Sequence, residues 1–113
     1  MNIIEDKIEF IDEMLTKNPQ DSYLRYAMAQ ELLLTGKESE GMSMLEGITK
    51  DDREFVYAYY PLGKLYDEKG KKSKAVKNYQ KGLIMARKQN MVEIEGQIAE
   101  ALMILDVYDH APY

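Results

Sequence analysis

The sequence matches itself when it is shifted by 34 residues, and this repeat constrains the fold more than any other feature. Six pairs of identical residues fall within one window of that shift. They are Tyr23 and Tyr57, Tyr26 and Tyr60, Gly36 and Gly70, Lys37 and Lys71, Ser39 and Ser73, and Arg53 and Arg87. A period of roughly 20–50 residues is typical of proteins built from stacked copies of one supersecondary unit.

Apolar residues recur every three or four positions along most of the chain, which is the spacing of helices that bury one face. Ile4, Ile8, Ile11 and Leu15 show this spacing near the N-terminus. Strand signals are nearly absent. The spacing predicts helices over 2–17, 21–35, 38–50, 54–69, 72–88 and 91–107. Short turns between helices of this length favour antiparallel hairpins.

The residues between these segments predict how the helices start. Asp21 is a candidate N-cap for the second helix, and Asp51-Asp52 precedes the fourth helix and could cap it. Pro61 falls inside the fourth segment, where an interior proline loses a backbone hydrogen bond at a cost of ~3 kcal/mol. We therefore expect the fourth helix to start late, near 57 or 58, or to bend.

The second copy of the repeat resembles the tetratricopeptide repeat (TPR), a helical hairpin of 34 residues. It matches the family pattern at Tyr59, Leu62-Gly63, Tyr66, Ala75 and Tyr79. The first copy carries a weaker form of the pattern at Arg25, Met28-Ala29, Leu32, Gly41 and Leu45. Arg53 and Arg87 stand where the family has a closing proline, and Ile48 stands where a small residue is usual.

The resemblance implies an all-α fold in which about six helices form antiparallel hairpins, stacked as a short right-handed superhelix. One TPR-like domain would span 1–113. Its parts would be an N-terminal half-repeat helix (1–20), two repeats (22–55 and 56–89), a C-terminal capping helix (91–107) and a tail (108–113). Gly63 and Ala75, as small residues on facing helices, would let the two backbones approach closely.

In this family the first helix of each hairpin lines a concave groove that binds peptides. The resemblance therefore implies a peptide-binding groove formed by Tyr23, Tyr26, Gln30, Leu33, Leu34, Tyr57, Tyr60, Lys64 and Asp67. Tyrosine combines a rigid apolar ring with a polar tip, which suits recognition. Tyr26 and Tyr60 could pack in the core instead, whereas Tyr59, Tyr66 and Tyr79 are expected to be core residues.

Some members of the family bind a C-terminal carboxylate with Lys, Arg and Asn side chains of the groove. Tyr26, Gln30 and Pro61 occupy those places here. We therefore expect the partner to be an unidentified protein or peptide that presents apolar side chains, in an extended or helical segment. The chain would act as a non-catalytic scaffold.

Charge is segregated along the chain. Residues 1–54 carry a net charge of −7, residues 55–92 carry +7, and residues 93–113 carry −5. Lys74, Lys77, Lys81 and Lys88 share one helix face, which we expect to be solvated. The alternative function is self-association, as a homodimer or larger assembly, in which acidic and basic faces of different copies meet or the C-terminal helices pair.

Several other function classes have no support in the sequence. The chain has no cysteine, and no phosphate-binding loop or metalloprotease motif is present. The one histidine, His110, is expected in a solvated tail. We expect no enzymatic activity, no cofactor and no metal. A net charge of −5 argues against a nucleic-acid partner, and no apolar run is long enough for a membrane span. A cytoplasmic location is the expected default.

Overall fold

The computed structural model describes residues 3–110 of the chain, except the side chains at 4, 5 and 107–110. Every regular element in this range is helical, with six α-helices and one short 3-10 helix, so the predicted all-α helical-repeat fold is confirmed. The helices divide into two compact units, Met1–Phe55 and Val56–Tyr113.

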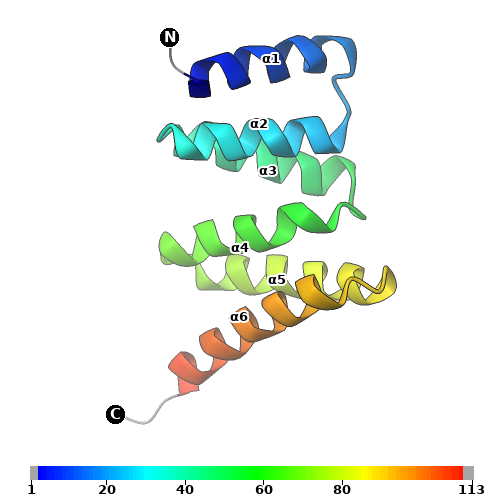
Figure 1. The fold of residues 1–113 in the computed structure, drawn as a ribbon. Coiled ribbons are helices and arrows are strands. Elements are labelled where there is room, and N and C mark those ends of the chain that lie inside the picture. Colours follow the sequence, from blue (N-terminus) through cyan, green and yellow to red (C-terminus); the bar gives the residue numbers. More distant parts are fainter. Residues whose placement is uncertain (1–2, 111–113) are drawn as a thin grey trace. The chain divides into compact units, whose positions relative to one another are not determined.

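The first unit contains three helices, α1 (Ile3–Lys17), α2 (Ser22–Leu34) and α3 (Glu38–Asp51). α2 and α3 form an antiparallel hairpin, and α1 packs against α2 (Figure 1). The core of the hairpin is made by three side chains from each helix. These are Met28, Ala29 and Leu32 on α2 and Met42, Leu45 and Ile48 on α3.

The second unit begins with the 3-10 helix η1 (Val56–Ala58), which leads directly into α4 (Tyr59–Glu68). α5 (Lys72–Lys88) packs against both α4 and α6 (Val92–His110). The largest side chains buried in this unit are apolar or aromatic. They are Tyr59, Leu62, Tyr66, Tyr79, Ile98 and Leu105, and the three predicted core tyrosines are therefore confirmed.

Three helices end in the same turn. Gly36 and Gly70 have φ values of +81° and +75°, and Asn90 follows α5 with φ of 57°. In each turn the next residue's N–H donates to a carbonyl five positions earlier, as from Lys37 to Leu32 at 2.9 Å. This is the Schellman arrangement, which satisfies carbonyls that a helix end leaves without partners. Its repetition 34 residues apart explains the matching glycines, Gly36 and Gly70.

The fourth helix starts late, as expected. η1 precedes it and α4 begins at Tyr59, which makes Pro61 its third residue. N–H groups of a first helical turn have no partner within the helix, so a proline there removes no hydrogen bond. Asp51 and Asp52 do not cap this helix, contrary to the prediction. Asp51 is the last residue of α3 and Asp52 is its C-cap.

Glycines accommodate large side chains inside each unit. A Cβ placed on Gly63 would lie 2.5 Å from Cε1 of Tyr79, and one placed on Gly82 would lie 2.7 Å from the Cβ of Tyr59. The nearest neighbours of Gly63 are thus atoms of the Tyr79 ring. The close approach of two backbones at Gly63 and Ala75 stays a prediction. The small size of Gly63 accommodates an aromatic ring.

Candidate functional site

The nine predicted groove residues are divided between the two units. Tyr23, Tyr26, Gln30, Leu33 and Leu34 lie on α2, Tyr57 lies in η1, and Tyr60, Lys64 and Asp67 lie on α4. None of the nine is fully buried. Tyr23, Leu34, Tyr57, Lys64 and Asp67 are exposed, while Tyr26, Gln30, Leu33 and Tyr60 are partly buried. All nine are thus accessible to a ligand to some extent.

The tyrosines of the first unit surround one buried ring. Phe55 is 6% exposed, and its centroid lies 5.0 Å from Tyr23 and 5.7 Å from Tyr26, both in edge-on geometry. The ring of Tyr23 is nevertheless 68% exposed. The Tyr26 hydroxyl accepts a hydrogen bond from the Gln30 amide at 3.2 Å. Contact with Phe55 therefore holds an exposed aromatic ring in place.

Polar contacts fix the start of α2 against the end of α3. The Asp21 carboxylate accepts from the backbone N–H of Leu24 at 3.0 Å, which confirms the predicted N-cap. The Ser22 hydroxyl donates to the Asp52 carboxylate at 2.6 Å. Arg25 forms a 3.0 Å ion pair with Asp51. Because Asp52 lies three residues before Phe55, these contacts position the segment that supports Tyr23.

Leu33 also packs inside the hairpin, a role that its sequence position does not predict. A Cβ placed on Gly41 of α3 would lie 2.9 Å from Cγ of Leu33. The side chain of Leu33 therefore packs across the hairpin, and only part of it remains accessible. Leu34, by contrast, is 71% exposed.

In the second unit, three of the predicted residues line one cleft. Tyr60, Lys64 and Asp67 on α4 face residues of α6 across a cleft of about 370 Å³. Tyr79 of α5 also lines it, with its ring centroid 5.9 Å from that of Tyr60. The residues contributed by α6 are Gln97, Glu100, Ala101, Ile104 and Leu105.

The hydroxyl of Tyr79 lacks a protein partner. The residue is 3% exposed, and within residues 3–110 the hydroxyl makes no hydrogen bond. Burial, reinforced by the negative charge that Tyr60, Asp67 and Glu68 contribute, raises the pKa of Tyr79 from 10.0 to about 12. The hydroxyl therefore stays protonated at neutral pH. A hydroxyl that reaches a cleft and has no protein partner is suited to a ligand.

The sequence does not predict that Phe55 supports the exposed tyrosines or that α6 lines a cleft. Phe55 lies within the predicted helix over 54–69, but the 34-residue shift pairs it with no similar residue, so no spacing rule marks it. From the sequence, 91–107 is expected to be a capping helix, and none of its residues is predicted to line a binding site. Only the packing of α6 against α5 brings Gln97 and Glu100 opposite α4.

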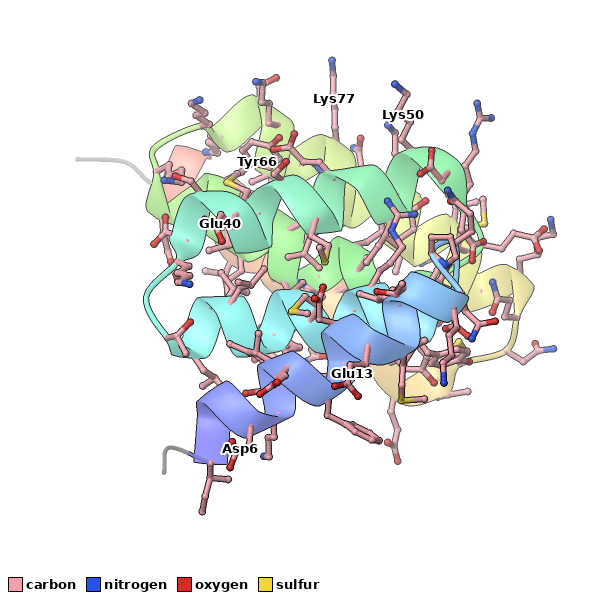
Figure 2. All side chains as sticks on the ribbon, turned by 90° about the horizontal axis from the view of Figure 1, so that it is seen from above. Asp6, Glu13, Glu40, Lys50, Tyr66 and Lys77 are labelled. Carbon is pink, nitrogen blue, oxygen red and sulfur yellow. The ribbon has the colours of Figure 1, made fainter. Side chains whose placement is uncertain are left out.

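The basic face of α5 is exposed, as expected of a solvated surface. Lys74, Lys77 and Lys81 are all exposed. Figure 2 shows Lys77 pointing away from its helix. The ammonium of Lys74 lies 5.5 Å from the ring centroid of Tyr66, a cation–π distance.

Within the described residues, no group of three or more His, Cys, Asp or Glu side chains is arranged to hold a metal ion. None of the described helices is both long and apolar enough for a membrane span. The predicted tail is in part helical, since α6 extends to His110. The His110 side chain and residues 111–113 lie outside the description.

Solved structures with this fold include a tetratricopeptide repeat domain protein from Salinibacter ruber. Its solution NMR structure has a TM-score of 0.75 and 28% identity, covering 84% of this chain and 96% of that one. Its crystal structure has a TM-score of 0.73 and 29% identity, covering 76% and 96%. The Yersinia enterocolitica type III secretion translocator chaperone SycD has a TM-score of 0.82 at 11% identity, covering 94% and 74%.

No protein-family model matches the sequence, and no curated protein matches it. The similarity to these solved structures defines the fold of the chain. The chain is a helical-repeat protein with the TPR fold, as the sequence predicts.

Proposed function

We propose that this chain is a non-catalytic protein-interaction module that binds a peptide or protein segment through the exposed tyrosine-bearing faces of α2, η1 and α4. The observation that carries the proposal is the ring of Tyr23. It is 68% exposed, yet its edge rests against the buried ring of Phe55. An exposed aromatic group that is already held in place loses little entropy on binding, which favours affinity.

The second unit offers a similar arrangement. Tyr57 is 38% exposed, and Tyr60 is partly buried against Tyr79. Aromatic anchors of this kind contribute most of the binding free energy in many protein interfaces. Similar structures support the same class of function, since one of them is named as a translocator chaperone. A cytoplasmic location remains a prediction.

The proposal can be tested by selecting random short peptides on the immobilised full chain. Binders that recur are then synthesised, and their affinities are measured for the wild type, Tyr23→Ala and Tyr23→Phe. We expect Tyr23→Ala to weaken binding by about tenfold, because a hot-spot aromatic side chain is worth ~1–2 kcal/mol or more. Tyr23→Phe keeps the ring and serves as the matched control. Failure to select any binder would contradict the proposal.

Self-association is a second candidate, because α1 presents an apolar stripe. Ile3, Phe10 and Met14 are exposed and recur at intervals of seven and four, which places them on one helix face. Acidic residues flank this stripe, and Figure 2 shows Asp6 and Glu13 projecting from α1. An acidic helix with exposed apolar groups is complementary to the basic face of α5 in another copy.

Light scattering coupled to size-exclusion chromatography separates the two candidates. Self-association through charge predicts a dimer or larger assembly at low salt that dissociates at high salt, because salt screens exposed charges. Replacing Phe10 with Ser would then also dissociate it. A monomer at both salt concentrations would contradict self-association and leave the tyrosine faces free for a partner.

A further inference from the structure

We propose that the cleft between α4 and α6 binds an arginine side chain presented by the partner segment. This inference rests on the proposed function and names the chemistry that one part of the site recognises. The cleft has a volume of about 370 Å³, enough for one long side chain and its adjoining backbone.

The polar groups of the cleft are predominantly hydrogen-bond acceptors. The Tyr79 hydroxyl, the carboxylates of Asp67 and Glu100, and the amide oxygen of Gln97 can all accept. Among the side chains that the structure describes, neither Asp67 nor Glu100 makes an ion pair or a side-chain hydrogen bond. Arginine offers five N–H donors in a planar fork, so it can pair with several of these acceptors at once.

The cleft also has surfaces for the rest of an arginine side chain. Ala101 and Ile104 of α6 provide apolar contact for its methylene groups. The Tyr60 ring lines the same cleft and can stack on a guanidinium plane. The charged groups are two carboxylates, Asp67 and Glu100, and one ammonium, Lys64.

Other occupants match the cleft less well. An acidic side chain would face Asp67 and Glu100 and be repelled. An apolar side chain would seal off the Tyr79 hydroxyl without a hydrogen bond, which carries a desolvation penalty. Lysine has the right charge, but its three donors and compact ammonium cannot make the forked contact.

The test uses peptides selected on the immobilised full chain. A selected peptide that contains arginine is synthesised again with citrulline, which has a similar shape without the charge, and with lysine. Affinities are measured for the wild type and for the double variant Asp67→Asn/Glu100→Gln. The double variant Asp12→Asn/Glu13→Gln, which alters exposed residues of α1, is the matched control for net charge.

We expect citrulline to weaken binding to the wild type by about tenfold or more, since a hydrogen bond to a charged group is worth roughly 1.5–3 kcal/mol. Lysine should weaken it less. The Asp67→Asn/Glu100→Gln variant should lose the preference for arginine over citrulline, and the α1 variant should keep it. All four altered residues are exposed, so folding should be unchanged by circular dichroism.

Selected peptides without arginine, or peptides that bind equally well with citrulline, would overturn the inference while leaving the proposed function intact. An equal loss of affinity in both double variants would also overturn it, because the effect would then reflect net charge alone. Absence of any selected peptide would overturn the inference and the proposed function together.

Discussion

The ring of Tyr79 on α5 lies against the backbone of Gly63 on α4, so closely that a Cβ on Gly63 would be 2.5 Å from Cε1 and 2.7 Å from Cδ1 of the ring. Real Cβ atoms do not approach another atom so closely. The hairpin of the second unit is therefore built around a glycine that an aromatic ring covers. The ring belongs to the same tyrosine whose hydroxyl lines the cleft.

Gly63→Leu should destabilise the second unit severely, because its side chain would have to displace a packed ring and both helices. Overpacking typically costs about 1–3 kcal/mol, and a clash of this size belongs at or above the upper end. Chemical denaturation measures the change in the free energy of unfolding. Gly96→Ala is the matched control, since nothing lies within 4 Å of its Cβ position. It should stabilise by about 0.5–1 kcal/mol. An unchanged melting temperature for Gly63→Leu would refute this packing.

The free energy of unfolding should fall at high pH, because the buried Tyr79 then ionises. Burial raises the pKa of this residue to about 12 in the folded state, against 10.0 when it is unperturbed. A neutral hydroxyl is thus favoured by folding, and that contribution is fully present below pH 10 and is lost as pH rises from 10 toward 12. Tyr79→Phe keeps the ring on Gly63 but cannot ionise. The variant should show a smaller loss of stability over this pH range, and an identical profile would contradict the assignment.

Glycine at position 90 should make the protein at least as stable as asparagine does. The φ of 57° at Asn90 is left-handed, whereas the equivalent turns after α2 and α4 use Gly36 and Gly70. Asn90→Gly should be neutral or slightly stabilising, because glycine has no Cβ to strain in the left-handed region. Asn90→Ala should cost up to about 1 kcal/mol, because alanine keeps the strained Cβ and lacks the short polar side chain that lets asparagine tolerate this conformation. Thermal denaturation of the two variants checks the order. Greater stability of Asn90→Ala would contradict the proposed turn.

Asp21→Ala should destabilise the first unit by about 1 kcal/mol, the usual worth of an N-cap side chain. The carboxylate accepts from the Leu24 N–H at 3.0 Å, which alanine cannot replace. Asp21→Asn keeps an acceptor oxygen and should retain most of the stability. Equal losses in the two variants would show that the charge, and not the hydrogen bond, is responsible.

The sequence predicted the regular parts of the fold because their causes are local. Helical spacing, the Gly-Lys turns and the Asp21 cap are each determined by a few neighbouring residues. The 34-residue pattern likewise placed Tyr59, Tyr66 and Tyr79 in the core. Asp51 and Asp52 were misassigned because their carboxylates pair with Arg25 and Ser22 of α2, and these contacts join residues 26 and 30 positions apart.

The parts that sequence reasoning missed depend on packing between distant segments. Phe55 contacts Tyr23 and Tyr26 only because the hairpin brings residues 29 to 32 positions apart together. Gly63 was identified as a close-packing position with Tyr79 near it, but the direct contact of the ring with Gly63 is seen only in the packed hairpin. The cleft needs side chains from three helices, and its α6 residues follow no motif.

The most direct test of the account is chemical-shift mapping of a selected peptide on the isotopically labelled chain. If the tyrosine faces bind the partner, the largest shifts should fall on α2, η1 and α4. They should include Tyr23, Tyr26, Tyr57 and Tyr60, and Tyr26→Ala or Tyr60→Ala should weaken binding while helicity is kept. Shifts confined to the exposed faces of α3 and α5 would contradict the account.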